Sequence, residues 1–528
     1  MKFKISNIRS QIYNNKLIIL ILFLASSLRL YRIQDYMTFL GDEGRDVLVV
    51  YNILHGHLTL LGPTSSVGGF FLGPIYYYFM APFLWLFNYN PVGPAVMVAL
   101  FGIATVWLLY KFVSEIFNTR VGLIAAFLYS VSPIVISYSR SSWNPNPLPF
   151  FALLIMYVLY RNSLHKNNKL VLAAGILLGI AMQLHYLSLF LATIMFVYIL
   201  CSELVRSKFK LLEQIKTLVK EYAVLLTGFV IGWSPFLAFE LRHGFPDFIH
   251  IIDFVAHSGD TGVSSGFFAS IYDVFFRLFA RLVFAYPQVD QFGLFNKTLL
   301  DIWGLFALAI GILSLIVLLF RLYQSLKLRN KDINKYLFLS IWIILGVGLF
   351  GLYKKAIYEY YFAFMFPLPF ILTAFLIDEI GKFDKNRVFL VSAGVIFIAI
   401  SLLNLQGVPF RYQPNRQLNQ MKTISQFVLS KTDGKPFNFA LITGSNSDYA
   451  YRYFFTIWGN PPVTIQDAQV DPLRKTVTNQ LMVVCESLPC HPLGNPLWEI
   501  AGFGRADVAG EWNVSVVQVY RLVHYKGK

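Results

Sequence analysis

The chain carries three carboxylates and one arginine within the six residues from Gly41 to Asp46, directly after its first long apolar run. Charged groups at such a membrane edge stay hydrated while an attached lipid stays in the bilayer, so chemistry on a lipid-linked substrate is feasible there. We expect Asp42 to be the central catalytic group. The alternative is structural, because Asp42 could instead cap a short interfacial helix and pair with Arg45 or Arg32.

A second group of candidates follows the third apolar run, at Arg140, Trp143, Asn144 and Asn146. Amides suit sugar hydroxyls, an aromatic face suits a sugar ring, and a guanidinium suits phosphate oxygens. These residues could therefore bind a sugar phosphate. The same residues are also typical of a turn built from Asn-Pro steps, and the sequence leaves both interpretations open.

Two adjacent lysines, Lys354 and Lys355, precede the tenth apolar run on the side where basic residues are otherwise scarce. A phosphate at the bilayer surface would explain them, because a leaving group that gains negative charge needs cations. Lysines that snorkel from a helix end are the alternative. We expect Arg45 to help to bind the same phosphate. The remaining candidate binding residues also lie at the ends of apolar runs, and they are His185, Arg242, His243, Tyr358 and Tyr361.

The case for a metal is weak. Asp42 and Asp46 would lie one helical turn apart, and His55 and His57 follow them, but this spacing matches no recognised metal site. We therefore assign no metal ligand and expect no cofactor, with a divalent cation (Mg²⁺ or Mn²⁺) as the weaker alternative.

Membrane helices must position these residues, because the 528 residues are 56% hydrophobic and only 14% charged. Soluble domains carry roughly 25% charged residues. Segment 70–88 is apolar but is interrupted by glycine and proline, so we expect an interfacial or re-entrant segment, with a twelfth span as the alternative. About eleven spans are predicted, at 17–33, 92–112, 121–138, 147–160, 169–184, 186–200, 222–240, 299–320, 336–353, 361–378 and 388–405.

The lysines and arginines predict the orientation of these spans. With a cytoplasmic N-terminus, the inner segments hold 22 of them and the outer segments up to Tyr360 hold 10. The positive-inside rule then places Asp42 and the C-terminal tail outside the cytoplasm of a multi-pass inner (plasma) membrane protein. The net charge of +16 is largely this topology signal, and we expect no nucleic-acid partner.

Two domains are predicted. Residues 1–405 form the helical membrane domain, with 34–91 as its first outer loop, and residues 406–528 form a small extracytoplasmic α/β domain. Cys485 and Cys490 could form a disulfide in that oxidising setting. Within the tail, the residue types predict strands at 437–443, 481–486 and 514–522 and helices at 421–429 and 449–457.

The order of these motifs resembles the GT-C glycosyltransferases, in particular the bacterial branch related to protein O-mannosyltransferases and the lipid A aminoarabinose transferase (glycosyltransferase family 39-like). The resemblance covers roughly residues 15–405. It is carried by Asp42-Glu43, by Leu72-Gly-Pro-Ile-Tyr-Tyr-Tyr78, by Ser139-Arg140 with Asn144-Pro-Asn146, and by Tyr360-Tyr361-Phe362 with Pro367.

The resemblance implies that Asp42 is the essential acidic residue, that Glu43 is its partner, and that the donor is a sugar linked to a polyprenyl phosphate. Gly44-Arg45-Asp46 departs from the family pattern, and the acceptor-side residues cannot be mapped. The acceptor, whether a glycan, a lipid or a protein, is therefore left open.

We thus expect a membrane glycosyltransferase that transfers a sugar to an acceptor hydroxyl on the extracytoplasmic face, with inversion and with Asp42 as the base. No glycine-rich phosphate loop occurs in a strand-turn-helix setting, which argues against a nucleotide donor. A polysaccharide ligase of similar architecture is one alternative. A flippase or transporter of lipid-linked sugars is a second, although the charges avoid the middle of the spans. A non-catalytic membrane scaffold is the third.

Overall fold

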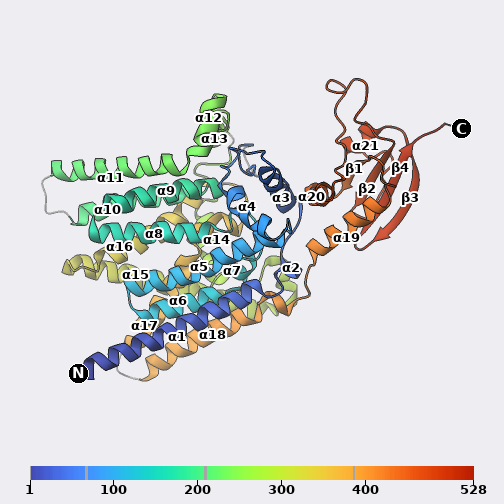
Figure 1. Ribbon diagram of the computed structural model, residues 1–528. Helices are drawn as coiled ribbons and strands as arrows, with labels where there is room; N and C mark the ends of the chain where they lie inside the picture. The colour runs from blue at the N-terminus through green and yellow to red at the C-terminus, as the bar shows by residue number, and fades with distance from the viewer. Residues whose placement is uncertain (1, 66–68, 207–210, 258, 384–386, 528) are drawn as a thin grey trace.

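The computed structural model describes residues 2–65, 69–206, 211–257, 259–383 and 387–527. A block of packed helices is followed by a small domain with one sheet, and the N-terminus lies at the end of the block remote from that domain (Figure 1). This arrangement confirms the predicted fold class of a polytopic helical protein with a C-terminal α/β domain.

The first half of the block contains both long apolar helices and short connecting ones. They are α1 (Lys2–Leu30), α2 (Ile33–Tyr36), α3 (Gly41–Leu54), α4 (Ile75–Leu86), α5 (Val92–Ile116), α6 (Thr119–Val131), α7 (Pro133–Tyr138), α8 (Leu148–His165), α9 (Asn168–Leu184) and α10 (Ser188–Arg206).

The second half of the block contains several short 3₁₀ helices, labelled η. Its elements are α11 (Leu211–Gly232), α12 (Ser234–His243), α13 (Pro246–His257), α14 (Phe267–Ala280), η1 (Val289–Leu294), α15 (Lys297–Leu328), α16 (Ile333–Gly348), η2 (Leu349–Leu352), η3 (Glu359–Met365), α17 (Pro367–Lys382), α18 (Arg387–Gln406) and η4 (Pro409–Arg411).

The number of spans is not settled by helix length. Within the described residues, five helices are long and apolar enough to cross a membrane, or up to seven if each of two bent helix pairs is one span. The count of about eleven therefore stays a prediction. The twelve residues of α4 would extend about 18 Å, well short of the ~30 Å hydrocarbon core, which favours the interfacial or re-entrant interpretation of segment 70–88.

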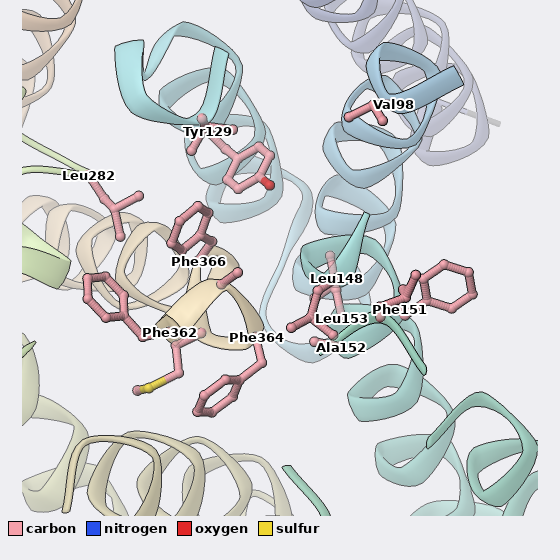
Figure 2. Close-up of a cluster of buried hydrophobic side chains, with 14 of the residues drawn as sticks. Val98, Tyr129, Leu148, Phe151, Ala152, Leu153, Leu282, Phe362, Phe364 and Phe366 are labelled. Atoms are coloured by element: carbon pink, nitrogen blue, oxygen red, sulfur yellow. The ribbon is translucent and has the colours of Figure 1, made fainter. Parts of the chain in front are cut away.

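The core of the block is rich in aromatic side chains. Phe362, Phe364 and Phe366, from the break between η3 and α17, are buried and lie toward α8 and α6 (Figure 2). The two helices meet at an angle of 58°, and Pro367 begins α17, where its missing N–H costs nothing. The break holds the tyrosine-rich segment before it at one end of the block.

The small domain contains α19 (Gln417–Ser430), β1 (Asn438–Ile442), α20 (Tyr449–Ile457), β2 (Gln480–Cys485), α21 (Trp498–Phe503), β3 (Ala506–Val514) and β4 (Val517–His524). The sheet order is β1-β2-β4-β3, with β1 parallel to β2 and the other pairs antiparallel. The expected elements are present, the last expected strand at 514–522 corresponds to β4, and β3 is an additional strand. Cys485 and Cys490 form a disulfide with a Cα–Cα separation of 6.1 Å, as predicted.

The small domain is called the outer domain below, after the location predicted for it from the sequence, and it packs directly on the segment between α1 and α3. The Arg416 N–H donates to the Asp35 carbonyl at 3.0 Å, and the Phe39 N–H donates to Gln417 Oε1 at 3.1 Å. Helix α20 lies against α3 (Figure 1). Two segments almost 400 residues apart in the sequence therefore form one surface.

Candidate functional site

Helix α3 begins at the acidic motif, and its first turn lacks a conventional cap. The N-cap residue is Leu40, whose side chain accepts no hydrogen bond. The Leu40 N–H donates to Glu43 Oε2 at 3.0 Å instead. The Gly41 N–H donates to Oδ1 of Asn446, from the outer domain, at 2.8 Å. Carboxylates in the first turn are stabilised by the positive end of the helix dipole. The acidic motif therefore stabilises the start of α3.

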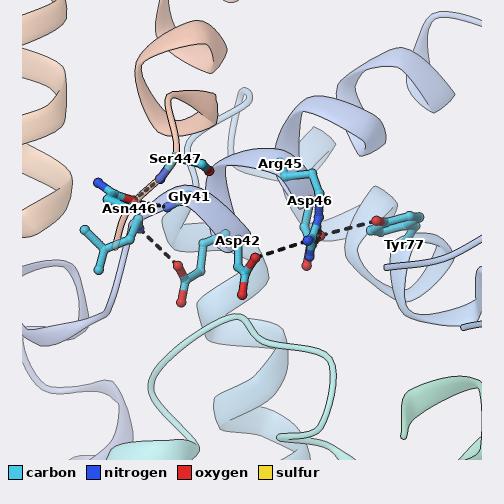
Figure 3. A network of polar contacts seen from close by, with 9 residues as sticks. Gly41, Asp42, Arg45, Asp46, Tyr77, Asn446 and Ser447 are labelled. Atoms are coloured by element: carbon cyan, nitrogen blue, oxygen red, sulfur yellow. Dashed lines mark hydrogen bonds and ion pairs between the residues drawn. The ribbon is translucent and has the colours of Figure 1, made fainter. Parts of the chain in front are cut away.

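The carboxylates of Asp42 and Asp46 have different surroundings (Figure 3). The Asp42 side chain is 58% exposed, and its Oδ1 lies 3.1 Å from Arg45 Nη1. Asp46 is fully buried and accepts hydrogen bonds from Arg45 Nε at 3.0 Å and Nη2 at 2.8 Å, and from the Tyr77 hydroxyl at 3.3 Å. Arg45 therefore links an accessible carboxylate to a buried one.

Burial alters the acidity of two carboxylates of the motif. It raises the pKa of Glu43 to about 7, although the backbone hydrogen bond from Leu40 opposes the change. Burial also raises the pKa of Asp46 to about 6, and the positive charge of Arg45 opposes that rise. A carboxyl group whose pKa lies near neutrality can exchange a proton at the pH of its surroundings.

The glycines of the motif allow the outer domain to approach. A Cβ on Gly41 would lie 2.1 Å from Ser447 Oγ, and a Cβ on Gly44 would lie 2.3 Å from the backbone nitrogen of Ala450. A larger residue at Gly41 would displace the β1–α20 loop, and one at Gly44 would displace the start of α20. The motif thus carries its carboxylates on one side of α3 and contacts the outer domain through its glycines on another side.

Asp42 and Glu43 both line a cavity of about 460 Å³ between the block and the outer domain, called the carboxylate cavity here. Most of its other polar lining consists of hydroxyls and amides. Asn146 lines it as well, and its Oδ1 is buried without a hydrogen-bond partner. The full lining is Thr38, Leu40, Gly41, Asp42, Glu43, Ser137, Tyr138, Ser141, Trp143, Asn146, Ser445, Asn446 and Ser447.

The structure separates the residues predicted after the third apolar run. Asn146 reaches the cavity, whereas Asn144 donates to the Leu184 carbonyl at 2.7 Å and so caps the end of α9. Arg140 is 1% exposed and donates to the carbonyls of Leu28 at 2.9 Å and Tyr31 at 2.8 Å, at the end of α1. This placement argues against a phosphate contact by Arg140, because its donors already satisfy helix-end carbonyls.

Of the predicted aromatic and histidine residues, His185, Tyr358 and Tyr361 gather behind the cavity wall. The Trp143 and Tyr360 rings lie 4.4 Å apart, and His185 contacts Tyr361 at 5.6 Å between ring centroids. Tyr358 stacks beside Tyr360 at 5.8 Å and is exposed. These residues are well placed to support Trp143, whose ring lines the cavity, but none of the others lines the cavity itself.

The predicted cations outside the motif line no cavity that we describe. Arg242 is exposed at the last turn of α12, beside His243, whose Nδ1 lies 2.9 Å from the Phe239 carbonyl. Lys355 forms an ion pair with Asp260 at 2.6 Å, and Lys354 is exposed next to it. Their role in binding phosphate therefore stays a prediction.

The prediction from the sequence did not include a second basic cluster. Arg277 and Arg281 lie one turn apart at the end of α14, and both face Glu359, with Arg281 in direct ion-pair contact and Arg277 Nη1 at 3.8 Å. The Nε atoms of both arginines are buried without a hydrogen-bond partner. The i, i+4 spacing of the two arginines was the signal available in the sequence, and their partner Glu359 comes from a distant segment.

Arg281 lines a second cavity of about 590 Å³, called the arginine cavity here. Arg411 lines it too, and Ser137 lines both cavities, so the two meet at α7. Part of its apolar lining comes from the N-terminal end of α15 and the C-terminal end of α18, at Trp303 and Leu403. Both helices expose many apolar side chains elsewhere on their surfaces, as expected of helices that face lipid.

No group of three or more His, Cys, Asp or Glu side chains is arranged to hold a metal ion in the described ranges. Asp42 and Asp46 are instead joined through Arg45.

Comparisons with known proteins agree with this architecture. Residues 72–236 match the family model of the dolichyl-phosphate-mannose-protein mannosyltransferases. YycA of Bacillus subtilis (strain 168), named as an inferred mannosyltransferase, is 29% identical over 163 residues, which are 30% of this chain and 23% of that protein. The match therefore spans less than a quarter of the relative's length.

Two solved structures share the fold over most of the chain. ArnT from Cupriavidus metallidurans bound to undecaprenyl phosphate has a TM-score of 0.59 at 13% identity, covering 95% of this chain and 97% of ArnT. The oligosaccharyltransferase AglB from Archaeoglobus fulgidus, in complex with an inhibitory peptide and a dolichol-phosphate, has a TM-score of 0.52 at 14% identity, covering 90% of this chain and 69% of AglB. The resemblance to the GT-C glycosyltransferases is confirmed, and the chain has their fold, with a segment similar to the protein mannosyltransferase family.

Proposed function

We propose that this protein is a membrane glycosyltransferase that transfers a sugar from a polyprenyl-phosphate-linked donor to an acceptor hydroxyl. The observation that carries the proposal is the junction of two unlike cavities at Ser137. One holds the exposed carboxylate of Asp42, and the other holds Arg281 between the ends of lipid-facing helices. The fold shared with ArnT, whose structure contains undecaprenyl phosphate, supports this choice of donor.

In this proposal the lipid phosphate binds in the arginine cavity and the polyprenyl chain extends along α15 and α18. The sugar then points past Ser137 toward Asp42. Arg281 and Arg411 stabilise the charge that develops on the leaving phosphate. The Arg281 side chain is only 12% exposed, and a charge shielded from water in this way acts more strongly on a nearby phosphate than an exposed one.

Asp42 acts as the general base. The acceptor oxygen forms a bond to the anomeric carbon, the bond from that carbon to the phosphate oxygen breaks, and its electron pair leaves with the polyprenyl phosphate. The acceptor proton passes to Asp42. Attack from the side opposite the phosphate inverts the anomeric configuration. Glu43 positions the start of α3 through its hydrogen bond from Leu40.

The side of the membrane is part of the proposal. The bias of lysine and arginine supports a location of Asp42 and the outer domain outside the cytoplasm. Nucleotide sugars are made in the cytoplasm, so a lipid-linked donor is consistent with that location. The Cys485–Cys490 disulfide supports an oxidising environment for the outer domain.

The direct test is an incubation of the purified protein with a panel of polyprenyl-phosphate sugars and acceptors, followed by measurement of released polyprenyl phosphate. We expect release from at least one donor, and no reaction with the corresponding nucleotide sugars. Movement of intact lipid-linked sugar between leaflets without release would support the flippase alternative. No release from any donor with any acceptor would contradict the proposal.

A further inference from the structure

A third cavity extends the carboxylate cavity along the outer domain. It has a volume of about 510 Å³ and shares Leu40, Ser445 and Asn446 with the carboxylate cavity. Its far end reaches Glu486 and Val516. The two cavities therefore form one groove, called the outer groove here, which leads from Asp42 across the β1–α20 loop toward the outer domain.

The polar lining of the outer groove consists of hydroxyls, amides and carboxylates. Gln417 and Gln420 line it on the α19 side, and Ser445 lies in its middle, while Trp143 offers an aromatic face near Asp42. Neither cavity of the groove is lined by a lysine or arginine among the described residues, whereas Arg281 and Arg411 line the arginine cavity. Amides and carboxylates can each bond several hydroxyls, and an aromatic face fits the apolar side of a sugar ring.

The walls of the groove are held rigidly. Asn446 Nδ2 donates to Glu486 Oε1 at 3.0 Å and to Oε2 at 3.1 Å, and the Tyr451 hydroxyl donates to Oε1 at 2.8 Å. Asn446 Oδ1 in turn accepts from the start of α3. One chain of hydrogen bonds therefore ties the outer domain to the helix that carries Asp42, so a ligand in the groove is held in register with the base.

We propose that the outer groove is the acceptor subsite and that it binds a neutral carbohydrate chain. The inference rests on the proposed function and adds the chemical class of the acceptor. The terminal sugar places its hydroxyl beside Asp42 and its ring near Trp143, and the next sugars lie along Ser445 toward Gln420. A phosphorylated headgroup is disfavoured, because the groove offers carboxylates where it would need cations.

The test uses Ser445→Trp, which fills the groove at the residue shared by both cavities. Ser445 is exposed, so the larger side chain is not forced into a core. Gln469→Trp is the matched control, since Gln469 is exposed on the outer domain and lines none of the cavities described here. The probes are neutral manno- and gluco-oligosaccharides of two to five units and threonine-containing decapeptides. Binding is measured by saturation-transfer NMR on the full-length protein with polyprenyl phosphate present.

We expect at least one neutral oligosaccharide to bind, with its affinity reduced at least tenfold in Ser445→Trp and unchanged in Gln469→Trp. Polyprenyl phosphate binding should be equal in all three proteins. Binding of the decapeptides in place of every oligosaccharide would overturn the inference, and so would oligosaccharide binding that survives Ser445→Trp. These results are distinct from failure of the proposed function, which would appear as the absence of polyprenyl phosphate release by the wild-type protein.

Discussion

The carboxylate cavity and the arginine cavity are neighbours with opposite chemistry. The first is lined by Asp42, Glu43 and many hydroxyls, and the second by Arg281, Arg411 and the ends of lipid-facing helices. A single residue, Ser137, lines both. In the proposed reaction, this difference keeps the acceptor, which loses a proton, apart from the leaving group, which gains negative charge. The predictions below test that division.

Replacement of the accessible carboxylate should have the largest effect. Asp42→Asn keeps the shape of the side chain but removes the charge and the base. We expect a folded protein with activity reduced at least ~10²-fold, measured as polyprenyl phosphate release. Asp35→Asn is the control, because Asp35 pairs with Arg32 at the surface and lines neither cavity. Near-normal turnover by Asp42→Asn would show that Asp42 is not the base.

Replacement of Arg281 should weaken the stabilisation of the leaving phosphate in the arginine cavity. A charge-assisted hydrogen bond contributes about 1.5–3 kcal/mol, so Arg281→Gln should lower turnover on the order of tenfold to a hundredfold. Glu359→Gln controls for the broken ion pair, and a matching loss in that variant would reduce the effect to a structural one. The double variant Lys354→Ala, Lys355→Ala distinguishes the arginine cavity from the two lysines as the phosphate site. A larger loss of turnover in this variant than in Arg281→Gln would indicate that the phosphate binds at the lysines.

Replacement of the buried carboxylate should affect stability more than turnover. Asp46→Asn leaves Arg45 with a weakened partner in a buried position, and loss of such a hydrogen bond to a charged group costs about 1.5–3 kcal/mol. We expect a lower Tm and a smaller loss of activity than for Asp42→Asn. A full loss of activity in a protein with unchanged Tm would transfer the catalytic role to Asp46.

Glu43 should make stability depend on pH. Its pKa is raised to about 7 in the folded state, so the folded protein binds a proton that the unfolded chain has already lost above a pH of about 4.5. Its contribution to stability therefore falls as the pH rises from about 4.5 to about 7. Glu43→Gln should remove this decrease, and the gap in Tm between pH 5 and pH 8 should shrink. An unchanged gap would mean that Glu43 is not the group responsible.

The sequence predicted the fold and part of the site for physical reasons. Apolar runs and the Asp42-Glu43 motif are local features, and they identified the helical block and the carboxylates. Strand β3 escaped because it is an edge strand with a mostly polar, exposed face. Asn446 escaped because it meets Gly41 across 405 residues of sequence. The local motif around Arg140 predicted a phosphate-binding residue, but the Arg140 guanidinium donates its hydrogen bonds to carbonyls at the end of α1.

The most direct test of the division between the cavities is the affinity for polyprenyl phosphate, measured by isothermal titration calorimetry on wild-type, Asp42→Asn and Arg281→Gln proteins in the same detergent. The account predicts equal affinity for wild type and Asp42→Asn, and affinity about tenfold or more weaker for Arg281→Gln. Tight binding by Arg281→Gln would contradict it, because the lipid phosphate would then lie outside the arginine cavity.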